Sequence, residues 1–207
     1  MSKTGQNNVC AVIPAAGRSS RMRSFKPLLR FDEDRTFIEK IVGEFLDFGC
    51  SEIVIIVNDE LYEQAWDDIF SKLDSGVSVI INDQLSFERY YSIKLGLQSL
   101  QNCEYCFIHN CDNPFVDQKI ITALFKNKIG NGYVSPTFNK QGGHPILISE
   151  PIIKSIIHSK GNDSNFRDVL NPFTSKKISI DTQDILANIN TELQYQQFAD
   201  FKQLLIK

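Results

Sequence analysis

The sequence predicts a single α/β domain whose sheet contains parallel strands. Two observations lead to this fold class. Short apolar runs alternate with helical patterns along most of the 207 residues, as they do where helices connect parallel strands. A chain of this length also fits one domain, which buries roughly 70% of the surface that the unfolded chain exposes. We expect residues 9–207 to form the domain and the polar residues 1–8 to be disordered.

The first half of the chain alternates strands and helices regularly. In order, we expect a strand at 9–14, a long loop at 15–35, a helix at 36–49, a strand at 52–57, a helix at 61–72, a strand at 77–81, a helix at 90–100, a strand at 105–109 and a helix at 117–126. The helix after the long loop has clear end signals, because Thr36 and Glu39 form a capping-box pattern and Gly49 is a helix stop.

The second half follows a different rhythm. Its expected elements are a strand at 132–135, an apolar stretch at 146–148, a helix starting near Pro151, a short helix at 164–170, strands at 177–180 and 185–189, and a C-terminal helix opened by a capping box at 191–194. Most polar loops follow strands. Open α/β sheets bind ligands at the carboxyl ends of their strands, so these loops are where we expect a site.

Charge, hydropathy and cysteine content limit the class of protein. A net charge of −3 argues against a general nucleic-acid binder, which needs a basic face. No apolar run approaches 18 residues, and the N-terminus lacks the apolar core of a signal peptide, so we expect neither membrane insertion nor export. An odd count of five cysteines favours free thiols in a reducing cytoplasm. Cys103 and Cys106 have redox or metal spacing, but no second pair accompanies them, which favours packing.

The loop after the first strand has the composition of a phosphate site. Small residues at 15–17 let backbone N–H groups approach a phosphate, and Arg18, Arg21 and Lys26 follow. Three cations near one turn repel one another unless an anion neutralises them, so the loop predicts a nucleoside triphosphate site. It contains neither of the two common glycine-rich phosphate motifs, and a solvated basic turn is the alternative.

Asp112 is the candidate metal ligand. It follows an apolar strand directly, which places its carboxylate at the crevice beyond the sheet. Mg²⁺ on a triphosphate takes one or two carboxylates and completes its shell with phosphate oxygens and waters. With a cationic loop on the first strand, Asp112 therefore favours a metal site. The alternative is that residues 112–114 form an ordinary turn.

Five further polar residues are candidates for substrate contacts. Asn82 and Ser92 lie after a strand and within the next helix, where they either contact the base or ribose or act as caps. His144 stands in a Gly-Gly-His-Pro loop and is either catalytic or a hydrogen-bonded structural residue. Asp163 and Arg167 are four residues apart on an expected helix, where they form either a surface pair or part of a substrate site.

Together these motifs resemble the MobA-like nucleotidyltransferases over about residues 9–198, and most closely the molybdenum cofactor cytidylyltransferase branch. The motifs that carry the resemblance are Ala-Ala-Gly-Arg-Ser-Ser-Arg-Met at 15–22, Lys-Pro-Leu-Leu at 26–29, Asn82, Ser92 with Gly-Leu at 96–97, Asp-Asn-Pro at 112–114, Gly-His-Pro at 143–145 and the segment 161–167. Many sugar and isoprenoid nucleotidyltransferases share the first motif. Gly-His-Pro and the Asp and Arg after it point to the molybdenum branch.

The resemblance implies a three-layer α/β/α fold with a Rossmann-like, mostly parallel mixed sheet of the nucleotide-diphospho-sugar transferase type. It implies a cytoplasmic enzyme that uses Mg²⁺ or Mn²⁺ to transfer CMP from CTP to a phosphorylated acceptor, molybdopterin, and releases pyrophosphate. A molybdoenzyme or a maturation chaperone is the suggested protein partner, and the chain is a monomer or a homodimer. The alternatives are a sugar-phosphate or methylerythritol-phosphate nucleotidyltransferase, and a nucleotide-binding regulator without turnover.

The resemblance also assigns roles to individual residues. The nucleotide-binding residues are Ala15, Ala16, Gly17, Arg18, Ser19, Lys26, Asn82 and Ser92. The catalytic residues are Lys26 at the α-phosphate, Arg21 at the departing pyrophosphate, and Asp112. The acceptor-binding residues are His144, Asp163 and Arg167, and the metal ligands are Asp112 and Asn190.

One departure concerns the second metal ligand. The family usually ends with Asp-Ile-Asp-Thr-Pro-Glu-Asp, whereas this chain has Asn-Ile-Asn-Thr-Glu-Leu-Gln at 188–194. Asn190 can offer a carbonyl oxygen to Mg²⁺ but brings no charge. We therefore expect Asn190 to be a weaker partner of Asp112, with a lower metal affinity or a different nucleotide or acceptor as the consequence.

Overall fold

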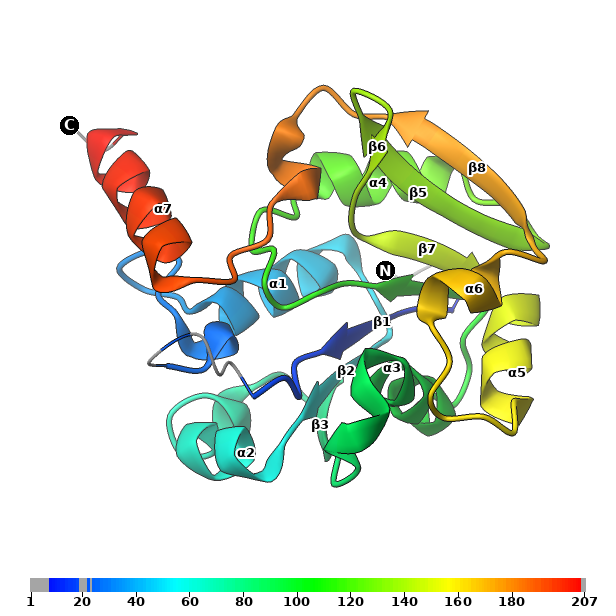
Figure 1. The fold of residues 1–207 in the computed structure, drawn as a ribbon, viewed down its shortest axis with the longest axis horizontal. Helices are drawn as coiled ribbons and strands as arrows, with labels where there is room; N and C mark the ends of the chain where they lie inside the picture. The colour runs from blue at the N-terminus through cyan, green and yellow to red at the C-terminus, as the bar shows by residue number, and fades with distance from the viewer. Residues whose placement is uncertain (1–7, 19–21, 23, 206–207) are drawn as a thin grey trace, which may run out of the picture.

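One mixed sheet of eight strands forms the middle layer of the described chain, in the computed structural model of residues 8–18, 22 and 24–205 (Figure 1). The strands are β1 (Val9–Pro14), β2 (Glu52–Val57), β3 (Val77–Ile81), β4 (Tyr105–Ile108), β5 (Gly132–Phe138), β6 (Gln141–Gly142), β7 (Ile146–Ser149) and β8 (Thr174–Ser179). The helices are α1 (Phe37–Phe48), α2 (Asp59–Ala65), α3 (Glu88–Ser99), α4 (Gln118–Lys126), α5 (Glu150–His158), α6 (Phe166–Leu170) and α7 (Glu192–Leu205).

The strand order confirms the predicted mixed sheet. Neighbouring strands run β3-β2-β1-β4-β7-β5-β6, and β8 pairs with β5. The strands β1 to β4 are parallel, because each is connected to the next through a helix. The strand β7 runs antiparallel to both β4 and β5, and β8 is parallel to β5. The carboxyl ends of β1, β3 and β4 therefore lie at one edge of the sheet, where ligands bind in such folds.

Alternate residues of β1 enter two separate hydrophobic cores, which confirms the three-layer arrangement. Ala11 and Ile13 pack in the core that the helices α1 and α4 cover. Cys10 and Val12 point to the other face and pack in the core that α3 and α5 cover. All four side chains are fully buried. A strand that is apolar on both faces needs a helical layer on each side, and this is why β1 reads as a continuous apolar run.

Gly96 sets how closely α3 lies against the sheet. A Cβ at this position would stand 2.5 Å from Cγ1 of Val12, so only glycine permits the contact between α3 and β1. The close approach brings the first turns of α3 beside the carboxyl end of β1. Two polar side chains, Arg89 and Ser92, enter the crevice from these turns.

Both predicted capping boxes are present. Thr36 accepts a hydrogen bond from the backbone of Glu39 and its own N–H donates to the Glu39 carboxylate at 2.8 Å, while Gly49 ends α1 at φ 95°. Thr191 and Gln194 bond reciprocally in the same way at the start of α7. These local signals depend on a few neighbouring side chains, which explains why the sequence shows them clearly.

The expected strand at residues 185–189 is wrong. Residues Gln183–Leu186 form a 3-10 turn, and the chain then continues without a strand. Ile185 and Ile189 are buried in two different cores, and this produced the strand-like spacing of apolar residues. The segment instead contacts the loops that contain His144 and Asp112. The Ile185 carbonyl accepts a hydrogen bond from the His144 N–H, and the Ile189 N–H donates to the Asp112 carbonyl at 2.9 Å.

The helix expected at residues 61–72 is shorter and starts earlier than predicted. The helix α2 begins after Asn58, whose side chain accepts a hydrogen bond from the Leu61 N–H, and it ends at Ala65. A separate 3-10 turn covers Phe70–Lys72. The remaining predicted elements are present, with ends shifted by a few residues. The strand β8 is an example, because its residues are mostly exposed and therefore gave only a weak hydrophobic pattern in the sequence.

An aromatic cluster joins α7 to the loop that follows the phosphate segment. Phe198 of α7 stacks on Phe31 with ring centroids 5.7 Å apart, and it meets Phe37 and Phe115 edge to face. Aromatic pairs of this kind stabilise by about 0.5–1.5 kcal/mol each beyond their buried area. The cluster connects α1, the segment after Asp112 and α7, and so fixes the C-terminal helix to the region around Asp112.

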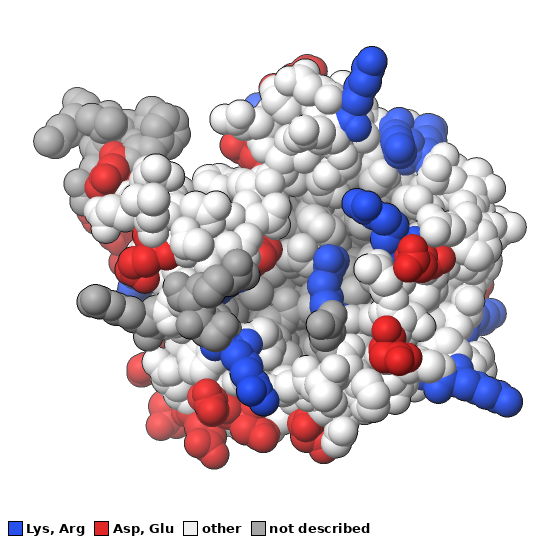
Figure 2. All heavy atoms as spheres, in the orientation of Figure 1, with Lys and Arg blue, Asp and Glu red and all other residues white. Residues whose placement is uncertain are grey.

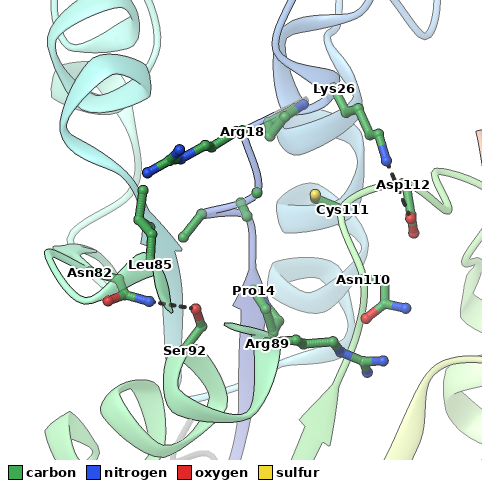
Figure 3. A pocket seen from close by; sticks show the side chains of 14 residues that line it. Pro14, Arg18, Lys26, Asn82, Leu85, Arg89, Ser92, Asn110, Cys111 and Asp112 are labelled. Atoms are coloured by element: carbon green, nitrogen blue, oxygen red, sulfur yellow. Dashed lines mark hydrogen bonds and ion pairs between the residues drawn. The ribbon is translucent and has the colours of Figure 1, made fainter. Parts of the chain in front are cut away.

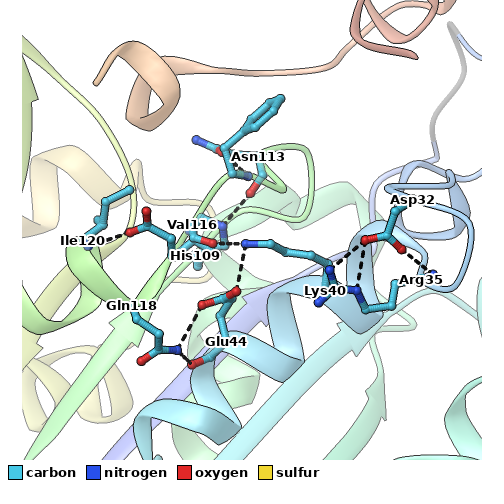
Figure 4. A network of polar contacts seen from close by, with 11 residues as sticks. Asp32, Arg35, Lys40, Glu44, His109, Asn113, Val116, Gln118 and Ile120 are labelled. Atoms are coloured by element: carbon cyan, nitrogen blue, oxygen red, sulfur yellow. Dashed lines mark hydrogen bonds and ion pairs between the residues drawn. The ribbon is translucent and has the colours of Figure 1, made fainter. Parts of the chain in front are cut away.

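A polar network fixes the chain that follows Asp112 onto α1 (Figure 4). The buried ammonium of Lys40 contacts the Val116 carbonyl and lies 3.3 Å from the Glu44 carboxylate. Gln118 donates to the Glu44 backbone carbonyl at 2.6 Å. Burial lowers the pKa of Lys40, and the neighbouring Glu44 carboxylate opposes that shift.

The five cysteines are free thiols. Cys106 is fully buried, and burial raises its pKa, which makes it an inert packing residue. In the described part of the chain, no three His, Cys, Asp or Glu side chains are grouped so as to hold a metal ion by themselves. None of the helices described is both long enough and apolar enough to cross a lipid bilayer.

Candidate active site

A cavity of about 490 Å³ lies at the carboxyl ends of β1, β3 and β4 (Figure 3). This volume is within the range of small-molecule sites, and the place is where the sequence predicted a ligand. The predicted residues that line it are Ala15, Ala16, Gly17, Arg18, Lys26, Asn82, Ser92 and Asp112. Residues from three regions of the sequence, 14–27, 82–92 and 110–112, thus converge on one space. Ser19 and Arg21 lie outside the described residues.

The backbone of the loop after β1 is anchored on its inner side and open on its outer side. The Ala15 N–H donates to the Ile56 carbonyl at 2.7 Å, and the Asn58 side chain donates to the Ala16 carbonyl at 3.2 Å. At Gly17, a Cβ would meet no heavy atom within 4 Å, so this residue borders open cavity. A larger side chain there would fill space that a ligand needs, and this fits close approach of a phosphate to the backbone.

Lys26, Asp112 and Asn190 come together at one end of the cavity. The Lys26 ammonium donates to Oδ1 of Asn190 at 2.6 Å and lies 3.8 Å from Oδ2 of Asp112. These residues come from a loop, the turn after β4 and the segment before α7. The side-chain oxygens of Asp112 and Asn190, the two residues predicted to hold a metal ion, thus lie on either side of the Lys26 ammonium.

The carboxylate of Asp112 has one oxygen atom that is available to bind a cation. Its Oδ1 atom is buried and accepts no hydrogen bond from any residue that the structure describes. Burial raises the pKa of Asp112, while the positive charges of Lys26 and Arg89 oppose the shift. A buried carboxylate with an unpartnered oxygen, beside a neutral amide oxygen, fits a hard divalent cation that takes its other ligands from phosphates and water.

A buried histidine, His109, holds the turn that contains Asp112 through a hydrogen bond to its backbone. His109 is fully buried, and its Nε2 donates to the Asn113 carbonyl at 2.7 Å. The Asn113 side chain donates to the Asp184 carbonyl at 3.0 Å and accepts from the Phe115 N–H. Residues 112–114 thus form an ordered turn in which Asn113 has a structural role and Asp112 is left facing the cavity.

The folded protein should become less stable as the pH falls from about 6.5 to about 3. Burial lowers the pKa of His109 and of His144 to about 3, whereas an unfolded histidine has a pKa of about 6.5. A lowered histidine pKa means that the unfolded state binds protons first, so stability is complete above pH 6.5 and is lost below it. Urea denaturation at several pH values, with NMR of the histidine rings, measures this. A ring signal of His109 that titrates near pH 6.5 would contradict it.

Asn82 and Ser92 are bound to each other on the side of the cavity opposite Asp112 (Figure 3). The Asn82 amide donates to the Ser92 hydroxyl at 3.0 Å, and its carbonyl oxygen accepts from the Gln84 N–H. Both side chains are buried, with 1% and 3% of their surface exposed. They act as a structural pair between β3 and α3. The Ser92 hydroxyl retains a proton that it can donate to a bound base or ribose.

His144, Asp163 and Arg167 line a second cavity, of about 1110 Å³. Figure 2 shows this face of the molecule hollowed, with Lys and Arg side chains standing around the hollow. The aromatic residues of the second cavity are Phe87, Tyr90, Tyr133 and Phe166. The predicted acceptor residues are thus gathered in one place, but away from the residues predicted for the nucleotide.

The backbone at Gly143 packs closely against Ile185, and this contact positions His144 at the second cavity. A Cβ on Gly143 would stand 2.3 Å from the Ile185 carbonyl oxygen, which accepts a hydrogen bond from the His144 N–H at 3.0 Å. The His144 Nδ1 atom is buried and has no hydrogen-bond partner among the described residues. With its lowered pKa, His144 is neutral at pH 7. It can offer a ligand a hydrogen bond but no charge.

The expected helical pairing of Asp163 with Arg167 is wrong. The helix α6 begins at Phe166, so Asp163 lies before it and the two side chains do not share a helix face. No ion pair joins them in the described structure. Asn165 caps α6 by accepting from the Arg167 N–H at 2.9 Å. Both charged side chains are left to face the second cavity.

Sequence reasoning did not single out several residues of these cavities, among them Arg89, Asn110 and Lys177. Arg89 lines both of them, and Asn110 and Lys177 line one each. Asn110 lies two residues before Asp112 at the end of the same strand, so its position in the sequence could have indicated it. Arg89 and Lys177 belong to no recognised motif. Their place depends on the packing of α3 against β1 and on the pairing of β8 with β5, which only the tertiary structure shows.

A sheet of this topology, with a small-residue loop after β1 and a carboxylate after β4, fits the fold and site of a nucleotidyltransferase. Residues 11–178 match the family model of the MobA-like NTP transferase domain, and the chain belongs to this family.

Curated relatives carry several nucleotidyltransferase names. The chain is 27% identical to the molybdenum cofactor cytidylyltransferase of Escherichia coli K12, over 87% of this chain and 90% of that one. It is 30% identical to a probable molybdenum cofactor guanylyltransferase of Clostridium perfringens, over 63% and 60% of the two chains. It is 28% identical to the 2-C-methyl-D-erythritol 4-phosphate cytidylyltransferase of Clostridium acetobutylicum, over 54% and 49%.

Solved structures share the fold at low sequence identity. A nucleotidyl transferase from Methanothermobacter thermautotroptrophicus superposes with a TM-score of 0.76 at 19% identity, covering 95% of this chain and 98% of that one. The 4-diphosphocytidyl-2C-methyl-D-erythritol synthase of Anaerococcus prevotii has a TM-score of 0.74 at 14% identity, with 95% and 96% coverage. These similarities confirm the three-layer α/β/α fold.

Proposed function

We propose that the protein transfers CMP from CTP to the phosphate of molybdopterin, releases pyrophosphate and depends on Mg²⁺. The observation that carries this proposal is the pair of adjoining cavities. One has a backbone loop, cations and a carboxylate suited to a triphosphate, and the other has aromatic and cationic residues suited to a second substrate. A transferase needs two such spaces that meet, whereas a nucleotide-binding regulator needs only the first.

The second cavity favours an acceptor with a flat ring system and negative charge. An aromatic face such as that of Tyr133 stacks on planar rings, and Arg167 and Lys177 neutralise anions. Molybdopterin combines a pterin with a phosphate. The E. coli cytidylyltransferase also resembles the chain over most of its length, whereas the resemblance to the methylerythritol enzyme covers about half. Both comparisons support molybdopterin over a sugar phosphate.

The reaction is an in-line displacement at the α-phosphorus of the nucleotide. An oxygen of the acceptor phosphate forms a bond to the α-phosphorus, and the bond from that phosphorus to the β-phosphate oxygen breaks. The electron pair leaves with pyrophosphate. Little covalent chemistry falls to the protein, which aligns the two phosphates and neutralises their charge.

Residues of the first cavity hold the triphosphate and stabilise the charge that shifts during transfer. The backbone at Gly17 and the side chain of Arg18 bind the phosphates, and Arg21 offsets charge on the pyrophosphate. The Lys26 ammonium meets the α-phosphate, since it already stands beside the Asp112 carboxylate. When bound at Asp112 and Asn190, Mg²⁺ supplies further charge stabilisation at phosphate oxygens.

Substituting Asn190 by aspartate should tighten Mg²⁺ binding. A second carboxylate would add charge to a site that now has one carboxylate and one amide oxygen, and ligand charge is a main determinant of affinity for hard cations. We expect the Mg²⁺ concentration for half-maximal nucleotide binding to fall by about tenfold. Calorimetry of nucleotide binding across Mg²⁺ concentrations measures this, with Asn188→Asp as the matched control. An unchanged Mg²⁺ dependence would place Asn190 away from the ion.

A panel of substrates tests the proposed function. CTP, GTP, ATP and UTP are each incubated with the protein and Mg²⁺, and pyrophosphate is followed with molybdopterin, methylerythritol phosphate, a sugar phosphate or no acceptor. We expect release with CTP and molybdopterin. Release with another acceptor would support the alternative transferases. Nucleotide binding without release, even with molybdopterin present, would support the regulator.

A further inference from the structure

Arg89 stands where the two cavities meet. It comes from the first turn of α3 and is the single described residue that lines both of them. In Figure 3 its side chain runs past Pro14 toward Asn110, on the Asp112 side of the crevice and away from Asn82. Any group that passes from one substrate to the other must therefore pass close to this guanidinium.

The guanidinium of Arg89 is held in place without being neutralised. It lies over the ring of Phe166 with 5.8 Å between the guanidinium carbon and the ring centroid, a cation–π contact that fixes its orientation. No hydrogen bond or ion pair joins it to a side chain that the structure describes, and the residue is exposed to solvent. Its five N–H donors are consequently available to a ligand.

The surroundings of Arg89 combine one anion with one neutral donor. Its positive charge lowers the pKa of Asp112 in the first cavity and of His144 in the second. The Asp112 carboxylate is the expected ligand of a metal ion and would then be neutralised by it. His144 carries no charge at pH 7. With nucleotide and metal in place, Arg89 therefore has no counter-ion among the side chains that the structure describes.

Local stability does not explain an arginine at this position. A cation in the first turn of a helix is unfavourable because the N-terminal end of the helix dipole is positive. Phe87 at the N-cap of α3 provides no side-chain hydrogen bond that would offset this. A residue that works against its own helix is expected at functional sites, and the guanidinium attracts an anion.

We propose that Arg89 binds the phosphate of the acceptor and carries it into line with the α-phosphate of the nucleotide, which makes Arg89 a catalytic residue. This inference rests on the proposed nucleotidyl transfer. Two phosphate groups that approach bonding distance repel each other, and a bidentate guanidinium between them lowers that repulsion while fixing the attacking oxygen. The acceptor phosphate thus belongs at the junction, and the rest of the acceptor occupies the second cavity.

Inorganic phosphate tests this site without reference to the identity of the acceptor. The protein is first saturated with Mg²⁺ and the α,β-methylene analogue of CTP, or of whichever nucleotide the panel selects, and phosphate is then titrated by calorimetry. We expect Arg89→Gln to weaken phosphate binding by roughly tenfold to a hundredfold and Arg89→Lys to weaken it less. Arg30→Gln removes an exposed arginine that lines neither cavity and should match the wild type.

Two results of this titration would overturn the inference. Phosphate binding by Arg89→Gln at wild-type strength would show that Arg89 does not contact it. An equal loss of affinity for the nucleotide analogue would place Arg89 on the triphosphate. Steady-state kinetics then separates this inference from the proposed function. With an active acceptor, Arg89→Gln should lower kcat/KM for the acceptor roughly a hundredfold and leave the KM for the nucleotide unchanged. If molybdopterin is no substrate, the proposed acceptor fails while phosphate binding at Arg89 still stands.

Discussion

Replacing Lys26 with alanine should lower kcat by about a hundred- to a thousandfold, the usual effect of removing one donor that stabilises a developing charge. The Lys26 ammonium stands between Asp112 and Asn190, at the end of the cavity where we place the α-phosphate. Its loss would remove positive charge from the point at which negative charge increases during transfer. Stopped assays of pyrophosphate release under saturating substrate measure the change.

The same substitution should leave the fold intact. Lys26 lies in a one-turn 3-10 segment outside the sheet, and water can replace its hydrogen bond to Asn190. We expect the melting temperature to fall by a few degrees at most. Lys154→Ala is the matched control, since that lysine forms an exposed pair with Glu150 on α5. Wild-type turnover in Lys26→Ala would show that this lysine does not act on the phosphate.

Replacing Asp112 with asparagine should abolish Mg²⁺-dependent nucleotide binding while leaving stability equal or higher. The substitution keeps the shape of the side chain and removes the charge that a divalent cation requires. Because burial raises the pKa of Asp112 in the folded state, ionisation of this carboxylate lowers stability at pH 7. A neutral side chain relieves that cost. Calorimetry with and without Mg²⁺, together with thermal melts, measures both effects.

The raised pKa of Asp112 also predicts the direction of a pH effect. Protonation removes the metal ligand, so Mg²⁺-dependent nucleotide binding should weaken as the pH falls and should begin to do so above the usual aspartate range of about 4. Asp68→Asn, at an exposed position in the turn after α2, controls for the change of charge. Binding in Asp112→Asn that still responds to Mg²⁺ would move the metal site elsewhere.

Local patterns predicted much of the fold. The strands β1, β2 and β3 and the helix α1 have the predicted ends, because continuous apolar runs and a capping box depend on nearby residues alone. The strand predicted at 185–189 is absent, since Ile185 and Ile189 pack in two different hydrophobic cores rather than on one face of a strand. The position of β7 between β4 and β5 was not predictable from periodicity, because it depends on pairing between distant segments.

The candidate site was predictable where motifs carry it. The loop at 15–17, Lys26 and Asp112 were found from residue types in short segments, and the structure brings them together in one cavity. The contact between Lys26 and Asn190 spans 164 positions of the chain and had no local signal. Arg89 stood in no motif, and its place at the junction of the cavities follows from the close packing of α3 on β1.

Release of pyrophosphate from CTP by the wild-type protein, with Mg²⁺ and with molybdopterin present or absent, is the decisive measurement for the proposed transfer. We expect release only when both substrates are present, with one pyrophosphate formed for each molybdopterin converted to its cytidylated product. No release with molybdopterin, under conditions in which calorimetry shows that CTP and Mg²⁺ are bound, would contradict the proposed transfer.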